Sequence, residues 1–235
     1  MSLKLHTYEI ISSAVRQVKS LSQERGFPLH GALWAKWGVG KTKACRQVIK
    51  DFPDVFYLKF PNRPVEPSNL IKEVLLAAGV GPTRGYLQNY DLLKKVLSAR
   101  GLINPVLLLD EAQFLFSKPS ALSFFKDLSE DPDVGFSYVF LGDPDLETLL
   151  KAQGHSLIKR VRLKLPIPPI TQETIKKLSE FHGISLNGNA YPVAKSLGAV
   201  TMDADFALYL AKRAGKNELS DKEFKDFLII AMRGE

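Results

Sequence analysis

The stretch Ala35-Lys36-Trp37-Gly38-Val39-Gly40-Lys41-Thr42 constrains the fold of this chain more than any other. It matches the pattern G-x-x-x-x-G-K-[ST], with alanine in the first glycine position. In such a loop the backbone N–H groups turn toward a polyphosphate, and the following helix adds the positive end of its dipole. The apolar residues 29–34 suit a strand before the loop, and residues 43–50 suit a helix after it. The sequence therefore predicts a phosphate-binding loop between a strand and a helix.

Two side chains of this loop have specific expected roles. Lys41 would reach the β and γ phosphates of a nucleotide, and Thr42 would hold Mg²⁺. Alanine at position 35 suits the loop less well than glycine if that position requires a positive φ. A glycine-rich turn that contains Gly-Lys-Thr by chance is the alternative. The residues predicted to bind the nucleotide are Trp37, Gly38, Val39, Gly40, Lys41, Thr42 and Lys43.

A second stretch, residues 104–111, is an apolar run that ends in two carboxylates. Such a run predicts a buried parallel strand whose C-terminal end opens into a site. Beside a phosphate loop, Asp110 would organise the Mg²⁺ shell, and Glu111 would orient or deprotonate the attacking water. The alternative is a strand followed by a solvated acidic turn. The position of the run downstream of a phosphate loop favours the catalytic interpretation.

Composition fits one medium folded domain, alone or with a small appendage. The chain has 235 residues, of which 45% are hydrophobic and 24% charged. Its single cysteine, Cys45, cannot form an internal disulfide and is expected to pack inside a helix. The N-terminus lacks the apolar region of a secretion signal, and no apolar run is long enough to cross a bilayer. We therefore expect a cytoplasmic protein.

The net charge of +7 is unevenly distributed along the chain. Residues 1–50 carry nine Lys/Arg against two Asp/Glu, and residues 151–168 carry five against none. Residues 51–150 carry nine Lys/Arg against fourteen Asp/Glu. An acidic middle between basic segments favours nucleic-acid binding or charge-complementary self-assembly. A solvated basic face is the alternative.

Hydrophobic periodicity divides the chain near Pro168. Before it, strands alternate with helices, which predicts a three-layer α/β sandwich with a parallel sheet over residues 1–168. After it no strand is expected, and helices at 171–182, 189–197, 201–214 and 220–232 predict a small all-helical domain over 169–235. Thr171 and Ser220 are expected to start two of these helices, and Ser68 to start an earlier one. The expected strands are 29–34, 55–60, 104–109, 136–141 and 161–165; earlier helices are expected at 8–24, 43–50, 68–78, 90–97, 120–129 and 146–152.

With these motifs in this order, nearly the whole chain resembles the AAA+ ATPases. Within them it is similar to the MuB and TnsC group, which regulates DNA transposition. The features that carry this finer resemblance are Asp110-Glu111-Ala112 after the apolar strand and the run Leu141-Gly142-Asp143 that leads toward Leu146. The resemblance implies ATP and Mg²⁺ as ligands and a helical lid at the C-terminus.

The resemblance also implies two further catalytic residues and an assembly. Asp143 would be the sensor at the end of the fourth strand, where many members carry asparagine; a helix-capping role is the alternative. Arg160 would be the arginine finger that completes a neighbouring subunit's site, with Arg162 as a rival and a solvent-facing basic stretch as the alternative. Members often carry a sensor arginine in the lid, but residues 198–203 offer none, which leaves Lys195 or nothing.

DNA contacts are expected from the ATPase core, because the residues before Ala35 leave no room for the N-terminal DNA-binding domain of MuB. The positions that match the DNA-facing groups of TnsC-like filaments are Arg63, Thr83 and Arg84. Contacts of this kind go to phosphates, so they would be independent of sequence and sensitive to salt. Loop residues that merely face solvent are the alternative.

We therefore expect an ATP-dependent, oligomerising AAA+ ATPase that binds double-stranded DNA and regulates a partner such as a transposase. A replicative helicase loader, which would prefer single strands, is an alternative with the same fold. An ATP-gated interaction switch that binds only protein is an alternative from a different class.

Overall fold

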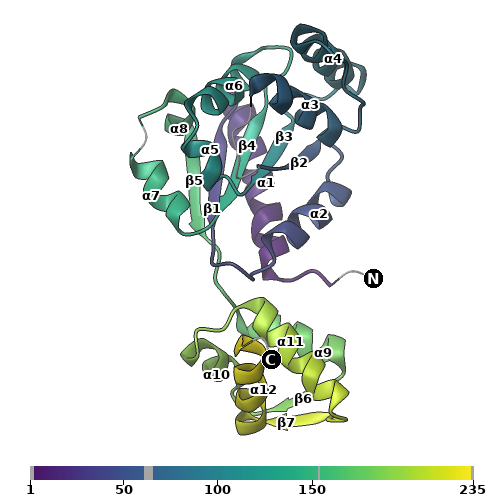
Figure 1. The fold of residues 1–235 in the computed structure, drawn as a ribbon, viewed down its shortest axis with the longest axis vertical. Helices are drawn as coiled ribbons and strands as arrows, with labels where there is room; N and C mark the ends of the chain where they lie inside the picture. The colour runs from purple at the N-terminus through teal and green to yellow at the C-terminus, as the bar shows by residue number, and fades with distance from the viewer. Residues whose placement is uncertain (1–2, 61–65, 153, 234–235) are drawn as a thin grey trace. The chain divides into compact units, whose positions relative to one another are not determined.

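The computed structural model describes residues 3–60, 66–152 and 154–233 (Figure 1). The chain forms two compact units. The sheet unit comprises Ile11–Trp34 and Cys45–Pro166, and the lid unit comprises Met1–Ile10, Ala35–Ala44 and Ile167–Glu235. The phosphate-loop segment thus groups with the C-terminal residues rather than with the sheet. The division at residue 168 into independent domains stays a prediction.

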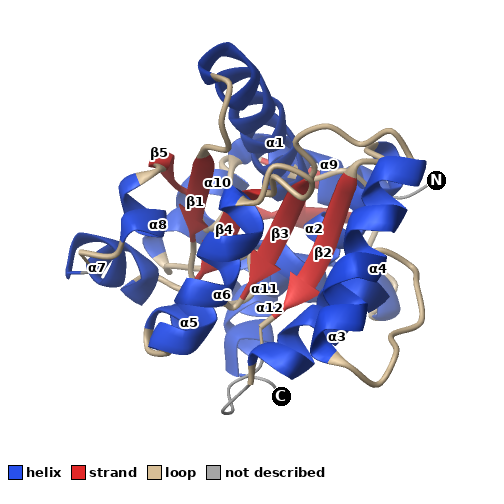
Figure 2. Cartoon of the chain, turned by 90° about the horizontal axis from the view of Figure 1, so that it is seen from above, coloured by secondary structure: helices blue, strands red, loops and turns tan. Residues whose placement is uncertain are grey.

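The sheet unit contains a five-stranded parallel sheet in the order β2-β3-β4-β1-β5 (Figure 2). This confirms the predicted parallel α/β fold. In a parallel sheet the C-terminal ends of all strands lie at one edge, where ligands bind. The C-terminal ends of β1, β3 and β4 therefore lie at the same edge. The strands are β1 (His30–Trp34), β2 (Val55–Lys59), β3 (Val106–Asp110), β4 (Ser137–Gly142) and β5 (Val161–Pro166).

Helices cover both faces of the sheet, which is why its central strands are apolar along their whole length. On one face, Leu107 and Leu109 belong to the core cluster that includes α3 to α6. On the other, α1 packs so closely that a Cβ on Gly31 would lie 3.1 Å from Val18 Cγ2. The first eight helices are α1 (His6–Arg25), α2 (Lys41–Asp51), α3 (Pro67–Ala77), α4 (Tyr86–Ala99), α5 (Gln113–Phe116), α6 (Pro119–Glu130), α7 (Asp145–Ala152) and α8 (Ser156–Lys159).

The predicted cap of α3 is wrong. Glu66 occupies the N-cap position without a side-chain cap bond, and Pro67 begins the helix, so Ser68 lies inside it. Proline suits this first position because its φ is already helical and it has no N–H to satisfy. Leu115 and Phe116 of α5 are buried and belong to the core of the sheet unit. Cys45 is also buried, as expected.

The lid unit contains four further helices and two short strands that the sequence did not predict. The strands β6 (Ser185–Asn187) and β7 (Glu218–Ser220) form a parallel pair. The expectation of no strand after Pro168 is therefore wrong, because three residues are too few to produce an alternating pattern. Among the described residues, no helix is both long and apolar enough to span a membrane. The helices are α9 (Gln172–His182), α10 (Ala190–Ser196), α11 (Thr201–Arg213) and α12 (Asp221–Arg233).

Both predicted starts of lid helices are confirmed. Thr171 Oγ1 accepts a hydrogen bond from the Thr174 N–H at 3.1 Å at the start of α9. Before α12, the carboxylate of Glu223 accepts from the Ser220 N–H at 3.0 Å, and Ser220 Oγ accepts from the Glu223 N–H at 3.3 Å. These reciprocal bonds are those of a capping box.

Candidate nucleotide site

The predicted phosphate loop connects β1 to α2 and has the backbone expected of a phosphate cradle. Gly38 and Gly40 have φ of 85° and 86°, a region that glycine enters without steric cost. A Cβ on Gly40 would meet no atom within 4 Å, so the chain leaves space at this point. Ala35 is buried and is absent from the described residues with positive φ, which explains why alanine is acceptable there.

Two carbonyl groups of the loop are held by donors from the same unit. The Met202 N–H at the start of α11 donates to Gly38 O at 3.0 Å, and Thr7 Oγ1 in α1 donates to Val39 O at 2.7 Å. A Cβ on Gly38 would lie 2.7 Å from Val200 Cγ2, closer than real Cβ atoms approach. Contacts to α1 and to the lid residues 200–202 therefore fix the conformation of the loop.

Lys41 begins α2 and folds back over the loop. Its Nζ donates to Ala35 O at 3.1 Å and to Lys36 O at 3.4 Å. The first turn of α2 contains no acidic residue that would compete for a phosphate. Thr42 is half-buried, and Lys43 is exposed. An open glycine cradle, a lysine ammonium and a helix N-terminus together fit the phosphates of a nucleotide.

The remaining loop residues predicted to bind nucleotide differ in exposure. Val39 is buried, whereas the indole of Trp37 is 77% exposed. Backbone N–H groups rather than side chains bind phosphate in such loops, so both positions remain compatible with the prediction.

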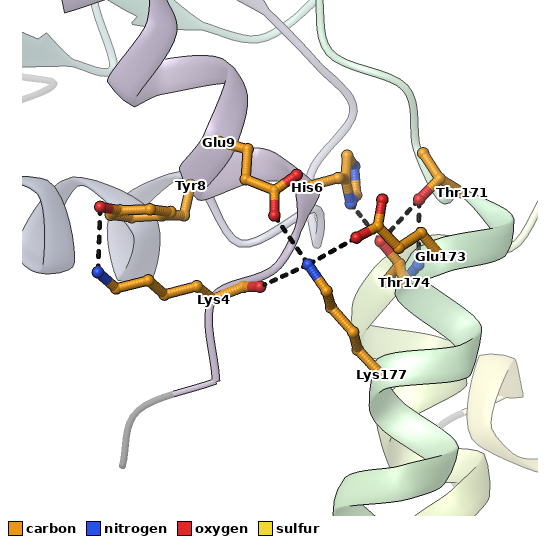
Figure 3. Close-up of polar contacts among 8 residues, drawn as sticks. All are labelled: Lys4, His6, Tyr8, Glu9, Thr171, Glu173, Thr174 and Lys177. Atoms are coloured by element: carbon orange, nitrogen blue, oxygen red, sulfur yellow. Dashed lines mark hydrogen bonds and ion pairs between the residues drawn. The ribbon is translucent and has the colours of Figure 1, made fainter.

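Figure 3 shows how the start of the chain contacts the first lid helix. His6 Nδ1 lies 2.6 Å from Thr174 Oγ1, and His6 Nε2 lies 2.9 Å from Pro168 O. A carbonyl can only accept, so Nε2 carries a proton; in the neutral imidazole, Nδ1 then accepts from the threonine hydroxyl. Burial favours this neutral form, because it lowers the pKa of His6. His6 thus ties α9 to the first turn of α1, where the neighbouring Thr7 contacts the phosphate loop.

A lysine reinforces the same contact. Lys177 Nζ in α9 lies 2.7 Å from Glu9 Oε1 and 2.8 Å from Glu173 Oε1, and it donates to Lys4 O at 3.3 Å (Figure 3). The two carboxylates raise the pKa of Lys177, chiefly through the hydrogen bond to Glu173. These residues join the beginning of α1 to the beginning of α9 inside the lid unit.

Asp110 is the last residue of β3 and is fully buried. Tyr57 in β2 donates its hydroxyl to Asp110 Oδ2 at 2.9 Å, and the Glu111 N–H donates to Asp110 Oδ1 at 3.1 Å. Both oxygens are therefore oriented by donors at the edge of the sheet where ligands are expected. Such orientation suits a carboxylate that organises a metal shell.

Glu111 follows in the left-handed conformation, with φ of 59°, which is uncommon for a residue with a side chain. Its carboxylate receives two partners: Gln113 Nε2 donates to Oε2 at 2.7 Å, and Lys59 Nζ lies 3.8 Å from Oε1. The solvated acidic turn, which was the alternative, does not describe these carboxylates, since Asp110 is buried and Glu111 is half-buried between two partners.

Asp143 follows β4 and makes the capping contact that was the alternative to a sensor role. Its Oδ1 accepts from the Asp145 N–H at 3.0 Å, where α7 begins. The side chain is partly exposed. Because β4 lies beside β3, Asp110 at the end of β3 and Asp143 just after β4 belong to neighbouring strand ends. The sensor role stays a prediction.

Arg160 precedes β5 and is paired within its own chain. Its Nη2 donates to Glu130 Oε1 at 2.8 Å, and its guanidinium lies 5.9 Å from the ring centroid of Phe27. The rival Arg162 is exposed on β5, the edge strand of the sheet. Lys195, considered in place of a lid arginine, is exposed in the last turn of α10. The finger and lid-sensor roles stay predictions.

The three predicted DNA contacts have different outcomes in the structure. Arg63 lies outside the described residues. Thr83 is bound to the buried Asn89 by three hydrogen bonds, of which the shortest joins Thr83 N to Asn89 Oδ1 at 2.6 Å. Arg84 is exposed in the loop before α4. Thr83 therefore shapes the loop that presents Arg84, and DNA binding by either residue stays a prediction.

The sequence reasoning missed the three residues that contact the carboxylates: Tyr57, Lys59 and Gln113. Tyr57 and Lys59 are two residues apart on β2, a spacing that places them on one face of a strand. That signal becomes specific only when β2 is known to lie beside β3, with Lys59 opposite Asp110. Gln113 is two residues after Glu111, and only the left-handed turn brings the two side chains together.

Comparison with known proteins places this geometry among nucleotide-binding domains. A family model described as AAA domain matches residues 27–150, more than half of the chain. No curated protein matches the sequence closely enough to count as a relative. The fold itself is shared with solved structures at low sequence identity.

Three of these structures illustrate the range of identity, coverage and TM-score. The ORC2 protein of Aeropyrum pernix, solved as ADPNP and ADP complexes, is 13% identical with a TM-score of 0.67; the match covers 99% of this chain and 69% of that one. The ORC1 protein of the same organism, solved in complex with DNA, is 17% identical with a TM-score of 0.62, covering 99% and 66%. The RuvB Holliday junction branch migration motor of Thermotoga maritima is 15% identical with a TM-score of 0.57, covering 99% and 70%.

Proposed function

Because the chain belongs to the AAA domain family, we propose that it is an ATP-dependent ATPase that oligomerises, binds double-stranded DNA and regulates a partner protein. The observation that carries the proposal is the loop after β1, where Gly38 and Gly40 have positive φ, space is open at Gly40, and the Lys41 ammonium supplies a positive charge that a polyphosphate would complement.

Each catalytic residue has a defined task in this proposal. Lys41 binds the β and γ phosphates, and Thr42 and Asp110 hold Mg²⁺. The metal, when bound, offsets charge on the phosphate oxygens. Glu111 accepts a proton from the attacking water or orients it. Asp143, just after β4, acts as the sensor.

Oligomerisation follows from the role proposed for Arg160. This residue enters the site of a neighbouring subunit, where its fixed charge stabilises the transferred phosphoryl group. To do so it exchanges the carboxylate of Glu130 for phosphate oxygens. A single subunit is then incomplete, so hydrolysis depends on assembly.

DNA binding is supported by the exposed Arg84, by the basic segments of the chain and by the DNA complex of the A. pernix ORC1 protein, which shares the fold. The contacts are made to phosphates. A transposase is the partner favoured by the sequence resemblance to the MuB and TnsC group. A replicative helicase loader is favoured instead if single strands bind more tightly than duplex.

Fluorescence anisotropy with labelled DNA of random sequence tests this proposal. We expect duplex binding that requires an ATP analogue, weakens steeply with salt and decreases in Arg84→Ala. Lys72→Ala in α3, a surface lysine of the same unit, is the matched control. Equal binding with and without nucleotide contradicts the ATP-dependent mechanism. Absence of DNA binding, together with ATP-dependent capture of a protein, favours the interaction switch.

A further inference from the structure

We infer that Gln113 is a positioning residue for hydrolysis, which holds the carboxylate of Glu111 in its working orientation. This inference rests on the proposed function, because it assumes that Glu111 acts on the attacking water. It concerns a residue outside the phosphate loop and the paired acids. The contacts that support it all lie within the sheet unit.

The backbone brings Gln113 back onto Glu111. Glu111 adopts the left-handed conformation at the end of β3, and the next N–H, that of Ala112, donates to Leu141 O at 2.8 Å. This bond attaches the turn to β4. The buried side chains of Leu115 and Phe116 then anchor α5 in the core. The first residue of α5, Gln113, is thereby fixed in place.

The side-chain amide can serve Glu111 in only one orientation. Its Nε2 lies 2.7 Å from Glu111 Oε2. The reversed amide would place an oxygen against a carboxylate, and two acceptors repel each other. On the far side of the amide, a Cβ on Gly142 would lie 2.8 Å from Gln113 Oε1, so β4 leaves room for the glutamine only because residue 142 is glycine. The amide therefore sits between the end of β4 and the carboxylate.

Stability does not account for a glutamine at this position. Gln113 is 9% exposed, and its Oε1 has no hydrogen-bond partner among the described residues. Burying an acceptor without a donor is unfavourable, and an apolar side chain of similar length would avoid that penalty. A residue that costs stability while it orients a catalytic group is typical of functional sites.

The carboxylate has a second, weaker restraint. Lys59 Nζ lies 3.8 Å from Glu111 Oε1, and its side chain is 59% exposed. An exposed lysine at that distance restrains the carboxylate loosely, because solvent screens the attraction. The short bond from the buried amide therefore dominates the orientation of Glu111.

A double-mutant cycle with Glu111→Gln tests the inference. We expect Gln113→Leu to lower kcat by about tenfold. A misplacement of about 1 Å in a reacting group can cost about a hundredfold in rate, and the carboxylate of Glu111 would lose its shortest restraint. KM for ATP should change by less than about twofold, since the substitution leaves the phosphate loop intact. Thermal unfolding should occur at an equal or higher temperature. In the Glu111→Gln background, the same substitution should have no further effect on kcat.

Gln88→Leu, which replaces an exposed glutamine of α4, is the matched control and should leave kcat unchanged. If Gln113→Leu fails to fold, Gln113→Met replaces it in the test. Methionine also lacks the N–H donor but is flexible, and the same changes in kcat and KM are expected. Unchanged kcat in Gln113→Leu overturns the inference, as does an equal loss in both backgrounds. Full activity of Glu111→Gln alone instead overturns the role proposed for Glu111, so the two failures are distinguishable.

Discussion

Arg160 and Glu130 form an ion pair within one chain, with Arg160 Nη2 2.8 Å from Glu130 Oε1. Glu130 is the last residue of α6, and Arg160 immediately precedes β5, so the pair ties the edge strand to the helix layer. If Arg160 completes a neighbour's site, this carboxylate is the partner that it must leave. The pair is partly exposed, and such pairs are readily exchanged because solvent screens them.

Mixing two inactive variants tests whether Arg160 acts in a neighbouring subunit. Lys41→Ala and Arg160→Ala should each lose hydrolysis by at least about a hundredfold, because each removes a charge that the phosphoryl group needs. A mixture should regain part of the activity, since some interfaces then combine an intact loop with an intact arginine. A steady-state ATPase assay over mixing ratios measures this. Activity that stays at the level of the separate variants excludes action in trans.

Removing the charge of Glu130 should make assembly easier. In Glu130→Gln the guanidinium loses its ionic partner, so half-maximal ATPase activity should be reached at a lower protein concentration. The matched control is Glu147→Gln, which removes the i,i+4 ion pair with Lys151 on α7 instead. An unchanged concentration dependence in Glu130→Gln would show that the pair does not compete with assembly.

Tyr57→Phe should weaken the response to magnesium. The hydroxyl of Tyr57 orients Asp110 Oδ2, and loss of a group that orients a metal ligand typically weakens metal binding by about tenfold or more. The Mg²⁺ concentration for half-maximal hydrolysis should therefore rise by about that factor. Tyr90→Phe, which removes a hydroxyl bonded to Asp131 on the same unit, is the control. A Mg²⁺ dependence that is identical in Tyr57→Phe and wild type contradicts the role of this contact.

The two left-handed glycines should differ in their tolerance of alanine. Both substitutions introduce a conformational cost of about 1–2 kcal/mol. Gly38→Ala additionally brings a Cβ within 2.7 Å of Val200 Cγ2, whereas Gly40→Ala meets nothing. Chemical denaturation should therefore show a larger loss of unfolding free energy for Gly38→Ala, and Val200→Ala should reduce that excess. Equal losses for the two glycines would indicate that the contact with Val200 does not restrain the loop.

Acidification should weaken the contact between His6 and α9. The pKa of His6 lies below its ordinary value of 6.5 because of burial, so the unfolded chain takes up the proton first as the pH falls. Stability from neutral His6 is thus complete above about pH 6.5 and is lost progressively below it. The buried His30, whose pKa is lowered to about 3 mainly by burial, acts in the same direction.

His6→Gln separates the two histidines. The amide can accept from Thr174 and donate to Pro168 O without titrating, so the variant should lose less stability than wild type between about pH 7.5 and 5.5. Thermal unfolding at both pH values measures the difference. Parallel pH dependences in the two proteins would assign the effect to His30 and other groups.

The sequence was sufficient to predict the parallel sheet and the loop because both depend on local signals. Apolar runs specify buried strands, and Gly38, Gly40 and Lys41 specify the cradle. The predictions that failed had no local signal. The strands β6 and β7 contain three residues each, and the start of α3 depends on Pro67 rather than on Ser68. Neither feature follows from hydrophobic periodicity.

The contacts of the carboxylates could not be predicted, because they depend on which strands are neighbours. Tyr57 reaches Asp110 because β2 pairs with β3. The order of strands in the sheet cannot be inferred from the sequence pattern of either strand. Gln113 reaches Glu111 only through the left-handed backbone at residue 111. Thr83 matched a DNA-facing position by resemblance, yet its hydrogen bonds are made to Asn89 within the same chain. Position in a motif therefore yields candidate site residues but not the residues that orient them.

Calorimetric titration with a non-hydrolysable ATP analogue and Mg²⁺ tests the central claim most directly, because the claim is that the loop ending in Lys41 binds triphosphate. We expect wild type and Glu111→Gln to bind with dissociation constants within about twofold of each other, since Glu111 acts on water rather than on nucleotide. Lys41→Ala should bind at least about tenfold more weakly, because it loses a charge-assisted contact to phosphate. Equally tight binding by Lys41→Ala and wild type would contradict the account.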